Sequence, residues 1–164
     1  MLSLALSAAL LMPQGTPPAQ VKEFAFWIGK WHCEGTSFSP ADPKKNQKPV
    51  AANKVFMDMG GFVVHENFKM DDFEGQSWSL YSPAKKKWQQ TWADNQGGYF
   101  VLEGAMDNGK LTLQTLTNPA RPKQFARMVF SHIKKDSFDW NWQRSTDAGK
   151  SWKDAWHLHY TRKP

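Results

Sequence analysis

The sequence predicts an all-β fold, a roughly ten-stranded antiparallel up-and-down β-barrel preceded by a short helix. Turn-forming residues recur about every 10 to 15 residues, which is the spacing of consecutive antiparallel strands. Aromatic residues, which favour pleated strands, are frequent: 11 Phe, 9 Trp and 3 Tyr in 164 residues. An open sheet of ten strands would leave two exposed edges, and closure into a barrel removes them. A two-sheet sandwich is the alternative fold.

The first segment of the chain, residues 1–19, is predicted to be a signal peptide. Residues 1–12 form an apolar run that is too short to cross a bilayer as a helix but has the length of a signal-peptide core. The mature chain is therefore expected to be periplasmic or secreted, with no membrane span. Residues 20–164 are predicted to form the single barrel domain, since this length suits one domain.

A short helix is predicted from Ala19 to Gly29. Val21, Phe24 and Ile28 follow a helical spacing, and Gly29 is a suitable stop. We expect this helix to cover or plug one end of the barrel.

Nine turn segments after the helix delimit about ten strands. Each is rich in Gly, Pro, Asp, Asn, Ser or Lys. In chain order they are residues 40–49, 60–61, 71–72, 82–83, 95–98, 107–109, 118–122, 135–136 and 146–149.

Alternation of apolar and polar residues identifies strands with one dry face. Phe138, Trp140 and Trp142 share a face, and the residues between them are polar. Aromatic side chains also line ligand pockets with large, stiff surfaces. The barrel is therefore predicted to bind a small hydrophobic or aromatic molecule without catalysis. Its predicted wall residues are Trp31, Phe62, Trp78, Trp92, Trp140, Trp142 and Trp156. The alternative is that these rings simply fill the interior.

Charge and cysteine content argue against several other classes of protein. The net charge is +6 with a pI near 9.4, but the Lys and Arg residues lie near turns and the terminus rather than along one stripe, so no nucleic acid is expected as a partner. Cys33 is the only cysteine, which excludes an internal disulfide and a thiolate metal cluster. It is predicted to be a buried small residue on a strand.

The sequence contains no G-x-S-x-G, H-E-x-x-H, Walker or dinucleotide-binding motif. No metal or cofactor is therefore predicted, and the protein is not expected to be an enzyme. A cofactor-free barrel enzyme remains an alternative, because an acid/base pair can assemble across strands. His157 and His159 share one strand face, and Trp156, Leu158 and Tyr160 share the other. Which face points inward stays open.

Two segments resemble known families. Residues 145–152, STDAGKSW, match the pattern of sialidase Asp boxes, which implies a structural hairpin and no catalysis. The opening residues 24–31, FAFWIGKW, resemble the start of lipocalin-like barrels. From residue 22 to residue 162 the chain is similar to a bacterial lipocalin-like family of unknown function, often exported, so the resemblance implies the fold and no reaction.

A narrower resemblance suggests haem. Residues 29–35, GKWHCEG, are similar to the first strand of nitrobindins, haem-binding ten-stranded barrels, and residues 156–160, WHLHY, resemble their last strand. This likeness implies His157 as the axial haem ligand and chemistry on nitric oxide or peroxynitrite. Cys33 departs from the pattern, which has glycine there.

Overall fold

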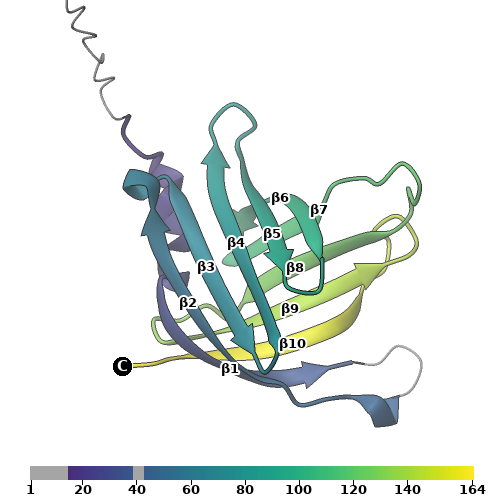
Figure 1. Ribbon diagram of the computed structural model, residues 1–164. Helices are drawn as coiled ribbons and strands as arrows, with labels where there is room; N and C mark the ends of the chain where they lie inside the picture. Colours follow the sequence, from purple (N-terminus) through teal and green to yellow (C-terminus); the bar gives the residue numbers. More distant parts are fainter. Residues whose placement is uncertain (1–14, 39–42) are drawn as a thin grey trace, which may run out of the picture.

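The computed structural model describes residues 15–38 and 43–164. Ten antiparallel strands form one closed barrel in the order β1-β10-β9-β8-β7-β6-β5-β4-β3-β2, which confirms the predicted fold over the sandwich (Figure 1). Residues 1–14, which carry most of the predicted signal peptide, lie outside the described residues. The strands are β1 Gly29–Ser37, β2 Val50–Asp58, β3 Val63–Met70, β4 Phe73–Ser82, β5 Lys87–Asp94, β6 Tyr99–Asp107, β7 Lys110–Thr115, β8 Phe125–Ser131, β9 Ser137–Ser145 and β10 Lys153–Arg162.

Closure depends on the pairing of the first and last strands. β1 and β10 pair in register, with Cys33 opposite Tyr160 and Gly35 opposite Leu158. The two strands approach closely at Gly35, where an added Cβ would lie 1.9 Å from the carbonyl oxygen of His157. Only glycine fits this approach, so the sequence supplies a small residue where the barrel shuts.

Each of the nine predicted turn segments coincides with a break between consecutive strands, although Ser82 and Asp107 are still the last residues of β4 and β6. Residues 40–42 of the first segment lie outside the described residues. Two of the segments overlap short 3₁₀ turns, η2 Pro43–Lys45 and η3 Met59–Gly61. The turn between β9 and β10 is held by Asp147, whose carboxylate accepts hydrogen bonds from the Ser151 amide at 2.9 Å and the Ser151 hydroxyl at 2.6 Å. These bonds lower the pKa of Asp147 to about 2.

The predicted N-terminal helix is present as the 3₁₀ helix η1, Ala19–Trp27. Its buried residues, Phe24 and Trp27, are three apart, which is the repeat of a 3₁₀ helix. Ile28 already has an extended backbone, so it does not continue the helical face. Glu23 accepts a hydrogen bond from the Trp88 indole at 2.8 Å, which ties η1 to β5. Figure 1 places η1 beside the end of the barrel where β10 finishes.

The inward face of β10 carries the apolar residues. Leu158 is 0% and Tyr160 2% exposed, whereas the side chains of His157 and His159 are 39% and 48% exposed. Trp156 shares the inward side. The two histidines therefore lie on the outer wall, which answers the question that the sequence left open.

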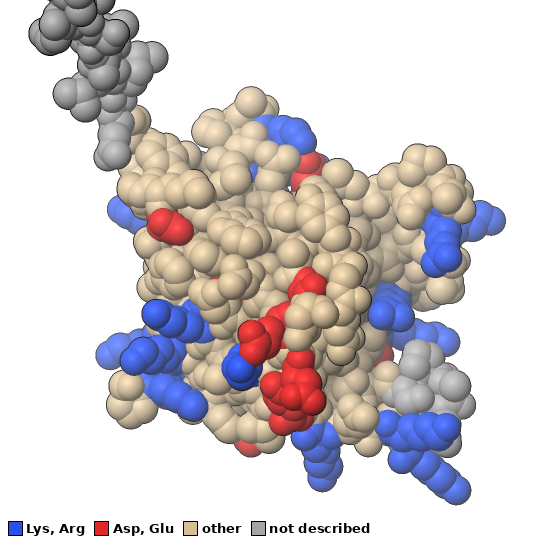
Figure 2. Space-filling view, in the orientation of Figure 1, with Lys and Arg blue, Asp and Glu red and all other residues tan. Residues whose placement is uncertain are grey.

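Charged side chains lie at separate places on the surface. On the face drawn in Figure 2, Lys and Arg gather in several groups around the edge, with Asp and Glu nearer the centre. In the part of the chain that the structure describes, no helix has the length and apolar character needed to span a membrane.

Candidate functional site

The interior of the barrel is divided into a filled half and a hollow half. In the filled half, rings from η1 meet rings from the strands: the centroid of Phe24 lies 4.2 Å from that of Trp88, and that of Trp27 lies 5.0 Å from that of Phe130. All four residues are 0% or 1% exposed. The helix thus plugs this end, as the sequence predicted, and leaves no room for a ligand among these rings.

The other half contains a pocket of about 390 Å³. This volume lies near the small end of the range of about 300–1,000 Å³ typical of small-molecule sites. Exposed residues such as Phe38 and Arg144 mark its mouth, and buried residues such as Glu66 and Tyr160 mark its floor. Its lining consists of Ser37, Phe38, Glu66, Phe68, Phe73, Trp92, Asp94, Gln96, Phe100, Leu102, Met128, Trp140, Trp142, Arg144, Ala155, Trp156 and Tyr160.

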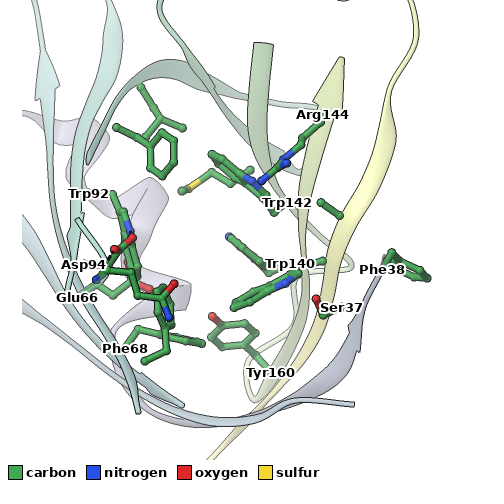
Figure 3. Close-up of a pocket in the computed structure, with 17 residues that line it drawn as sticks. Ser37, Phe38, Glu66, Phe68, Trp92, Asp94, Trp140, Trp142, Arg144 and Tyr160 are labelled. Carbon is green, nitrogen blue, oxygen red and sulfur yellow. Dashed lines mark hydrogen bonds between the residues drawn. The ribbon is translucent and has the colours of Figure 1, made fainter. Parts of the chain in front are cut away.

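Four of the predicted wall residues line this pocket: Trp92, Trp140, Trp142 and Trp156. Trp140 and Trp142 are stacked, with 6.5 Å between centroids and 9° between planes. Trp156 lies edge-on to Trp140 at 6.4 Å. In Figure 3, Trp92 and Phe68 lie across the hollow from Trp140 and Trp142. The pocket therefore has two facing aromatic walls.

The other three predicted wall residues lie elsewhere. Trp31 is 0% exposed in the filled half, where its indole donates to the Trp27 carbonyl at 2.7 Å. Phe62 follows η3 and does not line the pocket. Trp78 lies on the outer wall, 4.9 Å from the His65 ring, because its neighbours Ser77 and Ser79 take the inward positions of β4. Aromatic character alone did not reveal which strand face is inside.

A buried polar cluster forms the floor of the pocket. Glu66 is 5% exposed and accepts hydrogen bonds from Asn53 Nδ2 at 2.7 Å and from Ser77 Oγ at 2.6 Å. Asn53 Nδ2 also lies 3.4 Å from the Tyr160 hydroxyl, and Gln90 Nε2 donates to Ser77 Oγ at 3.3 Å. Side chains from β2, β3, β4, β5 and β10 thus meet at one level of the barrel.

The electrostatic state of the floor follows from its burial. Burial raises the pKa of Glu66 to about 7, although the hydrogen bonds from Ser77 and Asn53 act in the opposite direction. Burial also raises the pKa values of Tyr160 and Cys33. Cys33 is 0% exposed, as predicted, and a raised pKa makes it an unreactive thiol.

The mouth of the pocket carries one acidic side chain, Asp94, and one basic side chain, Arg144, on opposite walls. Asp94 accepts hydrogen bonds from Trp92 Nε1 at 2.9 Å and from the Gly98 amide at 2.8 Å. Burial acts to raise the pKa of Asp94, but these bonds and one from the Gln96 amide together lower it. Arg144 lies across the hollow from Asp94 (Figure 3).

His157, which the nitrobindin resemblance implies as haem ligand, lies outside the barrel together with two other histidines around the Asp139 carboxylate. His132 Nδ1 lies 2.8 Å and His159 Nδ1 2.7 Å from Asp139, and His157 Nε2 lies 3.8 Å from it. None of the described residues that line the pocket is a histidine. The residues present therefore do not fit a haem held inside the barrel by His157.

Alternation along β3 is a sequence pattern that indicates the buried polar floor of the pocket, which aromatic content alone does not reveal. On β3, Val64, Glu66 and Phe68 alternate with polar or exposed residues and all three are buried. An acidic residue two positions from an apolar residue on either side shares their strand face, so this pattern predicts an acid that points inward. By the same rule, Asn53 on β2 and Gln90 on β5 are inward polar residues.

A model of one protein family matches residues 16–162, which is most of the chain. The chain belongs to this family, DUF1579. The family is described as a protein of unknown function. None of the curated proteins matches the chain in sequence. Among solved structures it is similar to Rv2717c from M. tuberculosis, with a TM-score of 0.60 and 10% identity, covering 91% of this chain and 100% of that chain. At this identity the similarity shows the fold alone.

Proposed function

We propose that this barrel binds a small, largely apolar molecule in the pocket between its two aromatic walls. This proposal rests on the hollow of about 390 Å³ in one half of the interior, because the other half is packed solid. An unfilled space lined by Trp and Phe favours a flat or aromatic ligand, because ring faces stack and bury large apolar areas. The buried polar floor supplies a point of specificity.

The test is a titration with N-phenyl-1-naphthylamine, a neutral dye that fluoresces in apolar surroundings. We expect its emission to rise and saturate near one equivalent. Trp140→Ala removes one wall and should weaken binding by at least about tenfold. Trp78→Ala is the matched control, because this tryptophan lies on the outer wall. No rise in emission with verified folded protein, or an equal loss in both variants, would contradict the proposal.

A second candidate function is proton transfer to or from the bound molecule. Glu66 favours it, because burial brings the pKa of this pocket-lining carboxyl to about 7, where a general acid or base works best. The role would need no cofactor. The candidate base has no sequence motif, since its partners Asn53 and Ser77 come from other strands.

The probe reaction is the elimination of 5-nitrobenzisoxazole, a small apolar substrate. A carboxylate removes the proton from C3, the electron pair of the C–H bond forms the nitrile, and the N–O bond breaks, so that the ring opens to 2-cyano-4-nitrophenolate. We expect a rate that rises with the ionisation of Glu66 and is lost in Glu66→Gln. If the unaltered protein and Glu66→Gln react at the same rate at every pH, proton transfer by Glu66 is excluded as a function.

A further inference from the structure

Glu66 is a buried carboxyl that has no cationic partner among the described residues. Its two oxygens accept hydrogen bonds from Asn53 and Ser77, which are both neutral. None of the ion pairs found among the described residues includes Glu66. A buried charge with neutral partners alone is costly, and a ligand of opposite charge offsets that cost.

The hollow that Glu66 lines also contains an aromatic cage, formed by Phe68, Phe73, Trp92 and Trp156, of a kind suited to positive charge. Phe68 lies 6.4 Å from Trp156 and 6.3 Å from Trp92 between ring centroids, and Phe73 lies 6.1 Å from Trp156. The faces of aromatic rings carry negative electrostatic potential and attract cations, most strongly when water is excluded. The cage and the carboxyl line the same hollow.

The charged residues of the pocket lining also favour a positively charged ligand. Two acids, Glu66 and Asp94, line the pocket, and Arg144 is the one Lys, Arg or His among the described residues of that lining. Arg144 is exposed at the mouth, whereas Glu66 is at the floor. The deep part of the pocket is therefore complementary to a positive group, and its mouth tolerates polar substituents.

We propose that the ligand of this pocket is an organic cation, an amine or amidine whose charged nitrogen reaches Glu66 while its apolar body lies between the aromatic walls. This inference rests on the proposed small-molecule function and specifies the chemical class of the ligand. A nitrogen bearing hydrogens can donate to the free lone pairs of the Glu66 carboxylate, which still accepts from Asn53 and Ser77.

Three probes of nearly equal shape test the charge preference: 1-naphthylmethylamine, 1-naphthylmethanol and 1-naphthoate, which are cationic, neutral and anionic at about pH 8. Isothermal titration calorimetry gives each dissociation constant. We expect the amine to bind at least about tenfold more tightly than the alcohol, and the anion to bind most weakly. Glu66→Gln should remove the advantage of the amine. Glu34→Gln, an exposed acid on the outer wall of β1, should keep it.

The outcomes separate the two proposals. If the amine and the alcohol bind equally well to the unaltered protein, the cation preference is wrong and the small-molecule function stands. If none of the three probes binds and N-phenyl-1-naphthylamine also fails, the small-molecule function itself is wrong. If Glu34→Gln loses the advantage of the amine as fully as Glu66→Gln, surface charge rather than the pocket floor explains it, and the inference fails.

Proton release provides a second test that needs no variant. Titrations of the unaltered protein at about pH 6.5, in two buffers of different ionisation enthalpy, count the protons released on binding. Three other titratable groups lie around Glu66. Cys33 on β1 and Tyr160 on β10 stay neutral because their pKa values are raised. Asp94 on β5 stays charged because its pKa is lowered. Arg144 on β9 is the basic residue among the described residues of the same lining. The amine should therefore release a proton from Glu66 and the alcohol none. Equal release for both probes would overturn the inference.

Discussion

At the scale of single residues, Glu66 is where the chemistry of the pocket departs from ordinary apolar packing. Its carboxyl is held by Asn53 and Ser77 in the interior of the barrel, where the charged form is poorly solvated. The folded state therefore favours the protonated form more strongly than the unfolded chain does. This preference couples the stability of the whole barrel to pH.

The first prediction concerns that coupling. The pKa of Glu66 is raised from 4.5 to about 7, so its contribution to stability is fully present below about pH 4.5 and is lost as the pH rises through about 7. Relative to Glu66→Gln, the unaltered protein should lose up to about 3 kcal/mol over that interval. Urea unfolding of both proteins between pH 4 and 8 measures the difference.

The control for this measurement is Glu34→Gln, whose side chain is exposed on β1. The difference in unfolding free energy between this variant and the unaltered protein should stay within about 1 kcal/mol at every pH. A pH-independent difference for Glu66→Gln would contradict the placement of an ionisable carboxyl in the interior.

The residue scale also shows where prediction from the sequence ends. The structure places Trp140, Trp142 and Trp156 in the lining of the pocket, and strand alternation indicates which of such residues share a face. It places Trp78 on the outer wall, because β4 has serines at its inward positions and an aromatic residue outside. A polar residue faces inward when it has a partner there, and such partners come from other strands.

At the scale of elements, η1 acts as a plug through a small number of rings. Phe24 contacts Trp88 on β5 and Phe130 on β8, with centroid distances of 4.2 and 6.3 Å. The helix is short and packs through Phe24 and Trp27, so tertiary contacts rather than helix propensity hold it in place. The sequence predicted the helix and its role from apolar spacing, but not its 3₁₀ geometry.

The second prediction is that Phe24→Ala destabilises the protein by about 3–5 kcal/mol, because it opens a cavity among fully buried rings. Tyr99→Ala, which removes a ring that is 65% exposed, should cost about 1 kcal/mol or less. Chemical denaturation of the two variants gives both values. Equal costs would mean that η1 does not pack into the barrel.

The third prediction concerns the seam between β1 and β10. Gly35→Ala should destabilise the fold by about 1–3 kcal/mol or more, since the new methyl group would overlap the backbone of β10. Gly109→Asn is the control: it lies in an open turn with a φ of +73°, which asparagine tolerates, and should cost less than about 1 kcal/mol. Thermal unfolding compares them. A smaller loss for Gly35→Ala than for the control would show that the seam is loose.

At the scale of the whole molecule, turn chemistry and strand alternation were enough to predict a closed ten-stranded barrel. Local sequence fixes where each strand ends, and closure follows from pairing of the exposed edges. The division of the interior into a filled half and a hollow half was not predictable. It depends on how deeply η1 reaches and on which rings turn inward, and both are set by packing between segments far apart in the sequence, such as Trp27 and Phe130.

We expect the hollow half of the barrel to take up a small molecule and the filled half to take up none. The nine tryptophans report on both halves and on the outer wall. The protein labelled with 5-fluorotryptophan gives nine ¹⁹F resonances, each assigned by a single Trp→Phe substitution, and is titrated with N-phenyl-1-naphthylamine. We expect four resonances to shift and saturate together, those of Trp92, Trp140, Trp142 and Trp156. We expect the other five to stay in place, those of Trp27, Trp31, Trp78, Trp88 and Trp152. Nine unmoved resonances, or shifts centred on Trp78 at the outer wall, would contradict it.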